Sequence, residues 1–330
     1  MPVPIDLRPT PMSYFRLILR RFGEDAAQRE AILEGVGVSA EELDDPRTEI
    51  NFIQQMRQLD NMNRLFGEGW VLDAPELWTP AAHGALGVAV VSAPTIAVAA
   101  EVLAGYVSVR TPHQRLKLIR QPNAIILRHG PALRLSESLH RSTAEVVLLA
   151  VGAMLGWSLG SARSELRFDY MWAEPAYGPK LQKALAGKVR WRAGANAVII
   201  PKHLLDAPSP LADRVLYQSA LERLQEDKRS LSASDGVKGR AERLLAYSDT
   251  GRVSSSAAAR ALGLSQRTLA RRLADAGLNH RDLVDSELKA RARRWLDDGV
   301  LSRAEISERL GFADASGFNR ACRRWFKADA

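Results

Sequence analysis

Apolar residues recur at helical spacing in the first 62 residues, which predicts a helical start to the chain. Glycines and prolines then interrupt the pattern between Trp70 and Ala93. An alanine-rich stretch from Pro94 to Tyr106 predicts a further helix.

Short runs of alternating or continuous apolar residues follow and predict the strands of a sheet. These runs are residues 115–119, 124–127, 165–170, 188–192 and 197–200. Two longer apolar patterns, at 140–159 and 211–227, predict helices. Helices and short strands mixed in this way predict an α+β N-terminal domain.

The helix predicted at 211–227 carries a stripe formed by Leu216, Ala220 and Leu224. This stripe is equally compatible with dimerisation and with burial inside the first domain. Residues 229–239, RSLSASDGVKG, are polar and are expected to link two domains. The expected division is therefore 1–228, a linker at 229–239, and an all-α domain at 240–330.

The all-α domain contains two similar helix-turn-helix patterns, of which the first spans residues 253–273. Ser254 or Ser255 is placed to cap a short helix. Gly263 ends that helix, and Ser265 caps the next one.

The second helix of this pattern divides into a core face and a polar face. Leu269 and Leu273 share the core face. The residues expected to enter the major groove of DNA are Gln266, Arg267, Ala270 and Arg271. A guanidinium group matches the acceptors O6 and N7 of guanine, so base contacts are expected here, with a merely solvated face as the alternative.

The second pattern spans residues 302–326, where Ser302 and Glu305 form the spacing of a capping box. Gly311 is placed in the turn, and Asp314 caps the following helix. Phe318 and Cys322 are expected in the core together with Trp325 or Phe326. The residues left for DNA are Ser316, Asn319, Arg320 and Arg323.

One helix of about 27 Å is expected between the two patterns, at residues 281–298. Successive major-groove faces lie about 34–36 Å apart, so one chain can contact both. The charge agrees with this assignment. Residues 236–330 hold 19 Lys and Arg against 12 Asp and Glu, and thus +7 of the net +8. Clustered positive charge indicates a polyanionic partner.

Other features argue against a secreted, membrane-bound or enzymatic protein. The chain has one cysteine, Cys322, and lacks a basic start followed by an apolar run, so a cytoplasmic location is expected. The apolar stretch 144–159 contains Glu145 and is short for a membrane span. The histidines lack metal-ligand spacing, and no metal or cofactor is expected. The segment 156–160 matches G-x-S-x-G, but Ser158 follows a helix instead of a strand, which favours helix-end packing over catalysis.

The two helix-turn-helix patterns resemble those of AraC-type transcription regulators. The similarity lies in ARALGLSQRTLARRL at 259–273 and ISERLGFADASGFNRACRRW at 306–325. Cys322 occupies a position where the family usually has Phe, and Leu288 one where its linker helix often has Arg. The residues after Phe326 lack the family's Gly-x-Ser-Pro tail. We therefore expect the first pattern to supply more of the specificity. The resemblance implies double-stranded DNA and RNA polymerase as partners.

Residues 84–225 are similar in outline to the subgroup with the so-called arabinose-binding N-terminal domain. Trp172 stands where that subgroup has His, and Trp191 where it has Phe. The resemblance implies a small-molecule effector, of a kind that the domain's name does not fix. Candidate residues for an effector site are His83, Tyr170, Trp172 and Trp191, with core packing as the alternative for each. A constitutive regulator whose first domain only forms a homodimer is the alternative function.

Overall fold

The computed structural model describes residues 9–10, 12–45, 48, 50–131, 135–234, 236–246, 248, 252–298 and 301–326. The chain divides into two compact units, one made of residues 8–229 and the other containing residues 230–330. The N-terminal unit has its own hydrophobic core, and the C-terminal unit contains two smaller cores.

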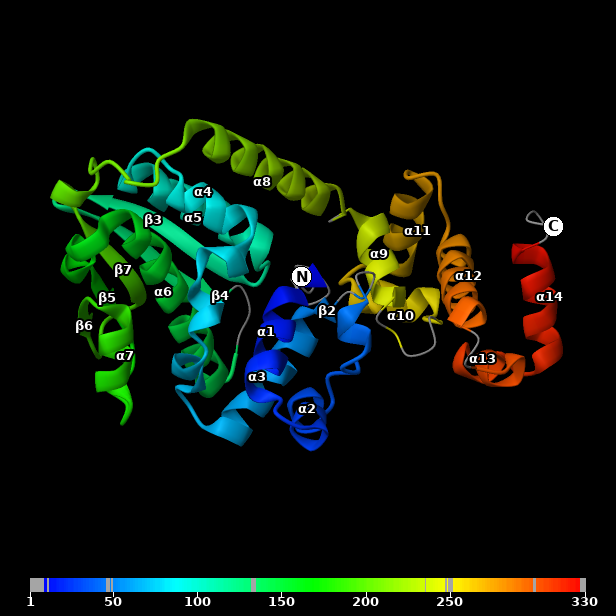
Figure 1. The fold of residues 1–330 in the computed structure, drawn as a ribbon. Coiled ribbons are helices and arrows are strands. Elements are labelled where there is room, and N and C mark those ends of the chain that lie inside the picture. Colours follow the sequence, from blue (N-terminus) through cyan, green and yellow to red (C-terminus); the bar gives the residue numbers. More distant parts are fainter. Residues whose placement is uncertain are drawn as a thin grey trace. The chain divides into compact units, whose positions relative to one another are not determined.

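The N-terminal unit is built on a five-stranded sheet with the order β3-β4-β7-β5-β6 (Figure 1). In that order the strands are Gln114–Gln121, Ala124–Pro131, Asn196–Pro201, Arg167–Asp169 and Lys188–Arg190. Neighbouring strands are antiparallel except β5 and β6. Burial alternates along β3, where Leu116 is buried and Arg115 and Lys117 are exposed, so the alternating pattern at 115–119 marks the covered face of the sheet.

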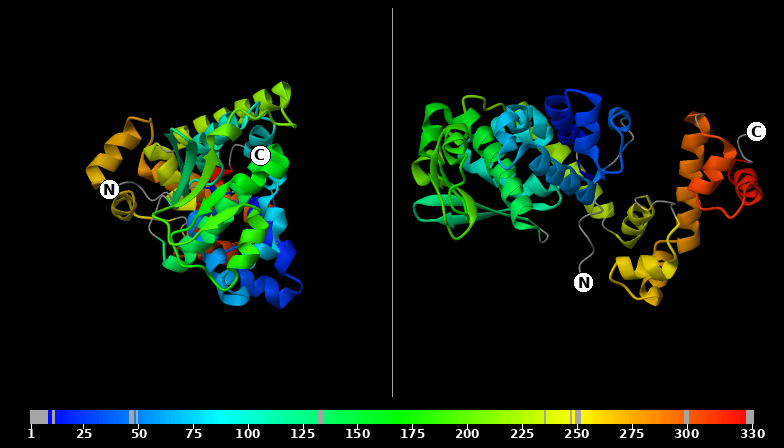
Figure 2. Two further views of the ribbon diagram at one scale, coloured as in Figure 1. Left: turned by 90° about the vertical axis from the view of Figure 1, so that its left-hand side faces the viewer. Right: turned by 90° about the horizontal axis from the view of Figure 1, so that it is seen from below.

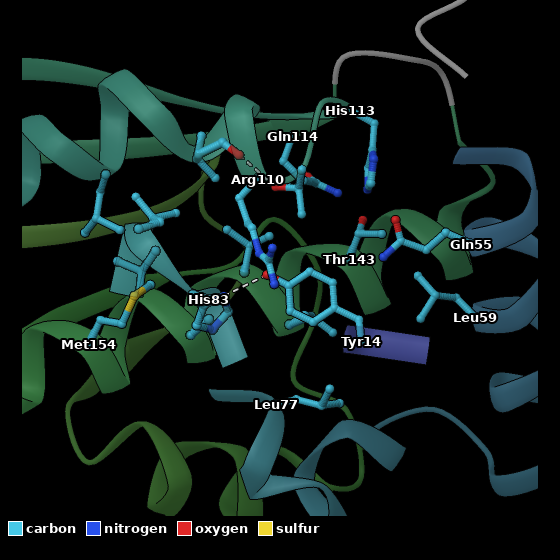
Figure 3. A pocket seen from close by; sticks show the side chains of 18 of the residues that line it. Tyr14, Gln55, Leu59, Leu77, His83, Arg110, His113, Gln114, Thr143 and Met154 are labelled. Atoms are coloured by element: carbon cyan, nitrogen blue, oxygen red, sulfur yellow. Dashed lines mark hydrogen bonds between the residues drawn. The ribbon is translucent and has the colours of Figure 1, made fainter. Parts of the chain in front are cut away.

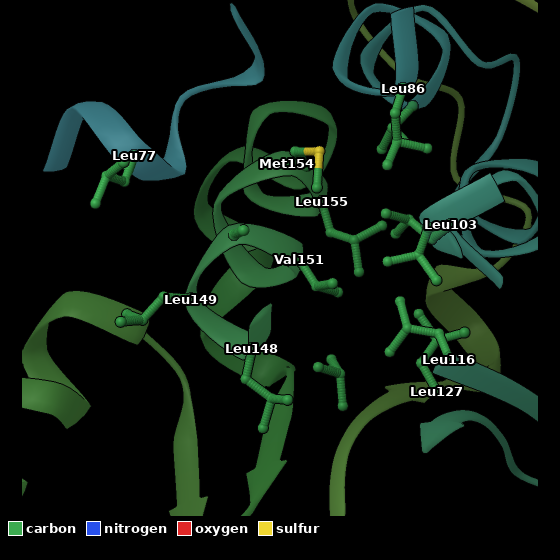
Figure 4. Packing of buried hydrophobic residues seen from close by; sticks show 14 of the residues in the cluster. Leu77, Leu86, Leu103, Leu116, Leu127, Leu148, Leu149, Val151, Met154 and Leu155 are labelled. Carbon is green, nitrogen blue, oxygen red and sulfur yellow. The ribbon is translucent and has the colours of Figure 1, made fainter. Parts of the chain in front are cut away.

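Two long helices, α5 (Ile96–Arg110) and α6 (Glu137–Leu159), share one core with the sheet. Figure 4 shows Leu103 of α5 and Val151 of α6 lying near Leu116 and Leu127 of the strands. Helix α6 is long and apolar enough to cross a membrane, yet 72% of its most apolar window is buried within the protein. Its composition is therefore that of a core helix.

Further helices complete the N-terminal unit. They are α1 (Met12–Phe22), α2 (Ala26–Leu33), α3 (Phe52–Phe66), α4 (Ala85–Val91) and α7 (Gly178–Leu185). A capping box between Asn51 and Gln54 begins α3. The glycine- and proline-rich segment forms the 3-10 turns Trp70–Asp73, Pro75–Trp78 and Pro80–His83. Two short strands that were not predicted, β1 (Pro9–Thr10) and β2 (Ile50–Asn51), pair with each other.

Helix α8 (Arg214–Ser234) carries the predicted apolar stripe, but only part of the stripe is buried. Ala220 and Leu224 are buried in the N-terminal core, as one interpretation expected. Leu216 is 54% exposed and lies outside that core. The predicted linker at 229–239 consists mainly of the end of α8 and the start of α9, and its residue 235 lies outside the described residues.

The C-terminal unit is helical throughout its described part (Figure 2). Its helices are α9 (Val237–Ala246), α10 (Ser255–Ala261), α11 (Gln266–Ala274), α12 (His280–Asp298), α13 (Arg303–Arg309) and α14 (Ala315–Trp325). The 19 residues of α12 span about 28 Å. Leu283 of α12 belongs to a core with α10 and α11, whereas Leu288 belongs to a second core with α13 and α14. The predicted fold class is confirmed in both units.

Candidate nucleic-acid interface and effector cavity

The first helix-turn-helix unit, α10 and α11, is fixed by caps at both helices. Ser254 Oγ accepts a hydrogen bond from the Ala257 amide at 3.1 Å, so Ser254 is the cap at this helix start. Ser265 Oγ accepts one from the Thr268 amide, also at 3.1 Å. Gly263 adopts a φ of 65° between the helices. A side chain there would be strained, and this explains the glycine in the turn.

The buried side chains show which face of α11 packs against the core. Leu269 and Leu273 are fully buried against Ala258 and Leu262 of the first core, which leaves the opposite face of α11 in solvent. The four residues proposed for DNA on this helix are all exposed: Gln266, Arg267, Ala270 and Arg271. A rigid helix thus presents two exposed guanidinium groups four residues apart, about one helical turn.

The second unit, α13 and α14, has the same construction. Ser302 and Glu305 form the predicted capping box, with the Ser302 amide 2.8 Å from Glu305 Oε2. Hydrogen bonding to Ser302 lowers the pKa of Glu305. Asp314 Oδ1 accepts a hydrogen bond from the Gly317 amide and caps α14.

The core of the second unit contains Phe318, Cys322 and Trp325, while Phe326 is only partly buried. Of the proposed DNA residues, Ser316, Arg320 and Arg323 are exposed. Asn319 is half-buried, and its Oδ1 accepts a hydrogen bond from Arg303 Nη1 at 3.2 Å. Asn319 therefore has a partner within the protein that the sequence did not predict.

Arg252 connects the two helix-turn-helix units. It precedes α10, yet its Nε donates a hydrogen bond to the Leu310 carbonyl at the end of α13, at 2.8 Å. Its guanidinium carbon lies 4.2 Å from the centre of the Phe312 ring. A charged hydrogen bond combined with a cation–π contact favours one arrangement of the two units. No local pattern indicated this contact, because the partners of Arg252 are 58 and 60 residues away along the chain.

The N-terminal unit contains a partly open cavity of about 80 Å³ beside α5 and α6 (Figure 3). At one end, the Tyr14 hydroxyl and His83 Nδ1 are 2.9 Å apart. Arg110 extends from the end of α5 to this pair, with its guanidinium carbon 5.3 Å from the centre of the Tyr14 ring. Burial, reinforced by the charge of Arg110, lowers the pKa of His83 to about 4, so His83 is neutral at pH 7.

Other polar groups in the cavity wall are buried without a partner. Among the described side chains these include Gln55 Oε1 and His113 Nδ1. Burial also lowers the pKa of His113 to about 3. Buried polar atoms are nearly always hydrogen-bonded in folded proteins, so two residues of the cavity wall carry polar atoms that lack the usual partner.

The structure separates the four residues predicted for an effector site. His83 lines the cavity, but Tyr170, Trp172 and Trp191 are not among its lining residues. The Tyr170 and Trp191 rings stack on each other at 5.1 Å, and the Trp172 ring packs against His140. Aromatic composition alone could not distinguish these packing roles from a ligand-binding role.

The G-x-S-x-G segment is helix-end packing, as predicted. Ser158 is buried in the last turn of α6, and its Oγ accepts a hydrogen bond from Ser209 Oγ at 3.1 Å. Gly160, with a φ of 55°, ends the helix. The strand before the serine that a nucleophile elbow requires is absent from this described segment.

Comparison with known proteins matches both units. Residues 27–209 match the family model described as the arabinose-binding domain of AraC transcription regulator, N-term, and residues 258–329 match a helix-turn-helix domain model. The ornithine utilization regulator of Pseudomonas aeruginosa is 25% identical over 318 residues, which cover 96% of this chain and 93% of that protein.

The transcriptional regulator VirS of Mycobacterium tuberculosis is 33% identical over 171 residues, which cover 51% of this chain and 49% of VirS. The crystal structure of the regulator CdpR from Pseudomonas aeruginosa aligns with a TM-score of 0.44 and 22% identity, over 97% of this chain and 96% of CdpR. The curated relatives named here are regulators of transcription or of a metabolic process.

Proposed function

Since this chain belongs to the AraC family of DNA-binding transcription regulators, we propose that a small-molecule effector bound in its N-terminal unit controls how its C-terminal unit binds DNA. The observation that supports effector control is the cavity of about 80 Å³ with unpartnered buried polar atoms in its wall. A ligand that prefers one state of the protein shifts the population toward that state.

DNA binding itself is assigned to the exposed faces of α11 and α14. Arg267 and Arg271 are proposed to contact bases or phosphates from α11. Arg320 and Arg323 are proposed to do so from α14, with Ser316 and Asn319 beside them. Asn319 is hydrogen-bonded to Arg303 within the protein, which agrees with a smaller contribution of the second helix-turn-helix to DNA specificity. We place the protein in the cytoplasm, with RNA polymerase as a further partner.

A cavity-filling substitution tests effector control. Ala150 lies in the cavity wall on α6, and Ala150→Leu should fill part of the space. A screen of metabolites by thermal unfolding should find a compound that raises the Tm of the wild type, because a ligand of the native state stabilises it. The same compound should change DNA affinity in gel shifts.

The matched control is Ala173→Leu, at an exposed alanine of the same unit. This variant should keep the response to the compound, whereas Ala150→Leu should lose it. A compound that acts equally on both variants would place the effector site elsewhere. Failure of every compound to shift the Tm would contradict effector control.

A homodimer is the second proposal, and a specific apolar surface favours it. Leu211, Val215 and Leu216 lie before and at the start of α8 with 45%, 72% and 54% of their surface exposed. Three large apolar side chains in solvent so close together favour a partner, and we assign a second copy of this chain. Sedimentation analysis should show a dimer that Val215→Glu dissociates; a monomeric wild type would contradict it.

A further inference from the structure

The cavity contains one side chain that is charged at neutral pH among its described lining residues, Arg110. Its histidines, His83 and His113, are neutral. Neither Asp nor Glu occurs among those lining residues. The cavity is thus mainly apolar with a single positive charge at one end.

The partners of Arg110 in the described structure are neutral. Its Nη2 donates to Ser13 Oγ at 2.7 Å and to the Ala82 carbonyl at 3.0 Å. Its Nε is buried and has no hydrogen-bond partner. Arginine does not lose its proton in proteins, so this charge persists. Arg110 is half-buried and has only neutral partners, so an anion placed beside it offsets the cost of partly removing its charge from water.

The rest of the wall favours a hydrocarbon group. Leu77, Leu86 and Leu103 line the space together with Val151 and Met154 of α6. At roughly 10–15 Å³ for each water-sized group, a cavity of about 80 Å³ has space for roughly five to eight such groups. This volume fits a short organic acid.

We infer that the cavity binds a small monocarboxylate, whose carboxylate accepts a hydrogen bond from Arg110 Nε and whose apolar body packs against the leucines and Met154. This inference rests on the proposed effector function and names the chemical class of the effector. An amino acid fits less well, because its ammonium group would meet no acidic side chain among the described lining residues.

Pentanoate and its neutral amide, pentanamide, are the probes for this inference. They have nearly the same shape and differ in charge. Pentanoate should raise the Tm of the full chain by several degrees at saturation and bind at least about tenfold more tightly than pentanamide. Arg110→Gln should abolish this preference. The control Arg128→Gln, at an exposed arginine on β4, should keep it.

Two further variants cover the case in which Arg110→Gln fails to fold. Arg110→Lys keeps the charge and should keep a preference for pentanoate. Ala150→Leu keeps Arg110 but should exclude both probes. Equal binding of pentanoate and pentanamide, with both excluded by Ala150→Leu, would overturn the carboxylate assignment and leave effector control standing. Pentanoate binding that survives both Arg110→Gln and Ala150→Leu would overturn the assigned site.

Discussion

The proposed recognition of bases depends on single residues of α11, and Arg271 is the residue that can be tested most directly. It is exposed one helical turn after Arg267, on a helix whose other face is anchored by fully buried Leu269 and Leu273. Anchoring matters because a side chain distinguishes bases only when its backbone is held in place. The guanidinium fork then supplies a two-point match to guanine.

Arg271→Ala should weaken specific DNA binding by roughly 1–3 kcal/mol, because a bidentate base contact is lost. Gel shifts with a specific fragment and a scrambled fragment measure this loss. Arg223→Ala removes the same charge from an exposed site on α8 and should leave the specific affinity unchanged. If the Arg271→Ala variant discriminated between the two fragments as well as the wild type does, Arg271 would not take part in base recognition.

Glu145 is a buried acid in the middle of the N-terminal core. Burial raises its pKa to about 7, although the Tyr177 hydroxyl donates a hydrogen bond to its Oε1 at 2.8 Å. The folded state therefore holds a proton that the unfolded state releases at lower pH. For such a group, stability falls as pH rises from about 4.5 to about 7 and stays low above that range.

Glu145→Gln should increase the free energy of unfolding at pH 8 by about 1–3 kcal/mol, because it removes the cost of the buried charge. At pH 4 the difference from the wild type should nearly vanish. Urea unfolding at both pH values measures this, with Glu174→Gln as the control at an exposed acid. An equal effect of Glu145→Gln at pH 4 and pH 8 would contradict the assigned titration.

At the scale of elements, the strands, helices and caps that depend on local sequence could be predicted. The strands β3 to β7 and the helices α5, α6 and α8 lie where apolar runs, alternation, alanine content or helical spacing predicted them. The caps Ser265, Ser302 and Asp314 were also predicted, since each acts within three residues. The helix-turn-helix patterns of the C-terminal unit could be predicted because they depend on such local signals.

The cavity and the contact between the helix-turn-helix units were not predicted, because they depend on distant residues. Tyr14 and His83 are 69 positions apart, and Ser13 and Arg110 are 97 apart. Tyr170 and Trp191 were candidates for an effector site with core packing as the alternative, and their rings stack on each other just after β5 and β6. Residue type indicates which chemistry is available, whereas the fold decides where it is used.

Arg252→Ala should loosen the arrangement of the two helix-turn-helix units. The variant loses the charged hydrogen bond to Leu310, worth about 1.5–3 kcal/mol, and the contact with Phe312. We expect weaker binding to DNA with two half-sites and unchanged binding to a single half-site. Anisotropy titrations of both fragments measure this difference, and an equal loss on the two fragments would indicate general destabilisation.

At the scale of the whole molecule, two chemically different units share one chain. Residues 236–330 carry +7 of the net charge of +8, which suits a phosphate backbone, and the remaining chain is nearly neutral. The N-terminal unit instead contains a mainly apolar cavity with one half-buried guanidinium group. This separation of charge matches a division between DNA binding and the sensing of a small molecule.

The proposed function depends on sequence-specific DNA binding by the C-terminal unit. Its most direct test is to titrate the full chain with genomic fragments selected for binding, and with scrambled DNA, from 50 to 200 mM salt. We expect an affinity for selected DNA at least about 10³-fold higher than for scrambled DNA, with both affinities falling as salt rises. Equal affinity for the two DNAs, or an affinity that salt does not change, would contradict it.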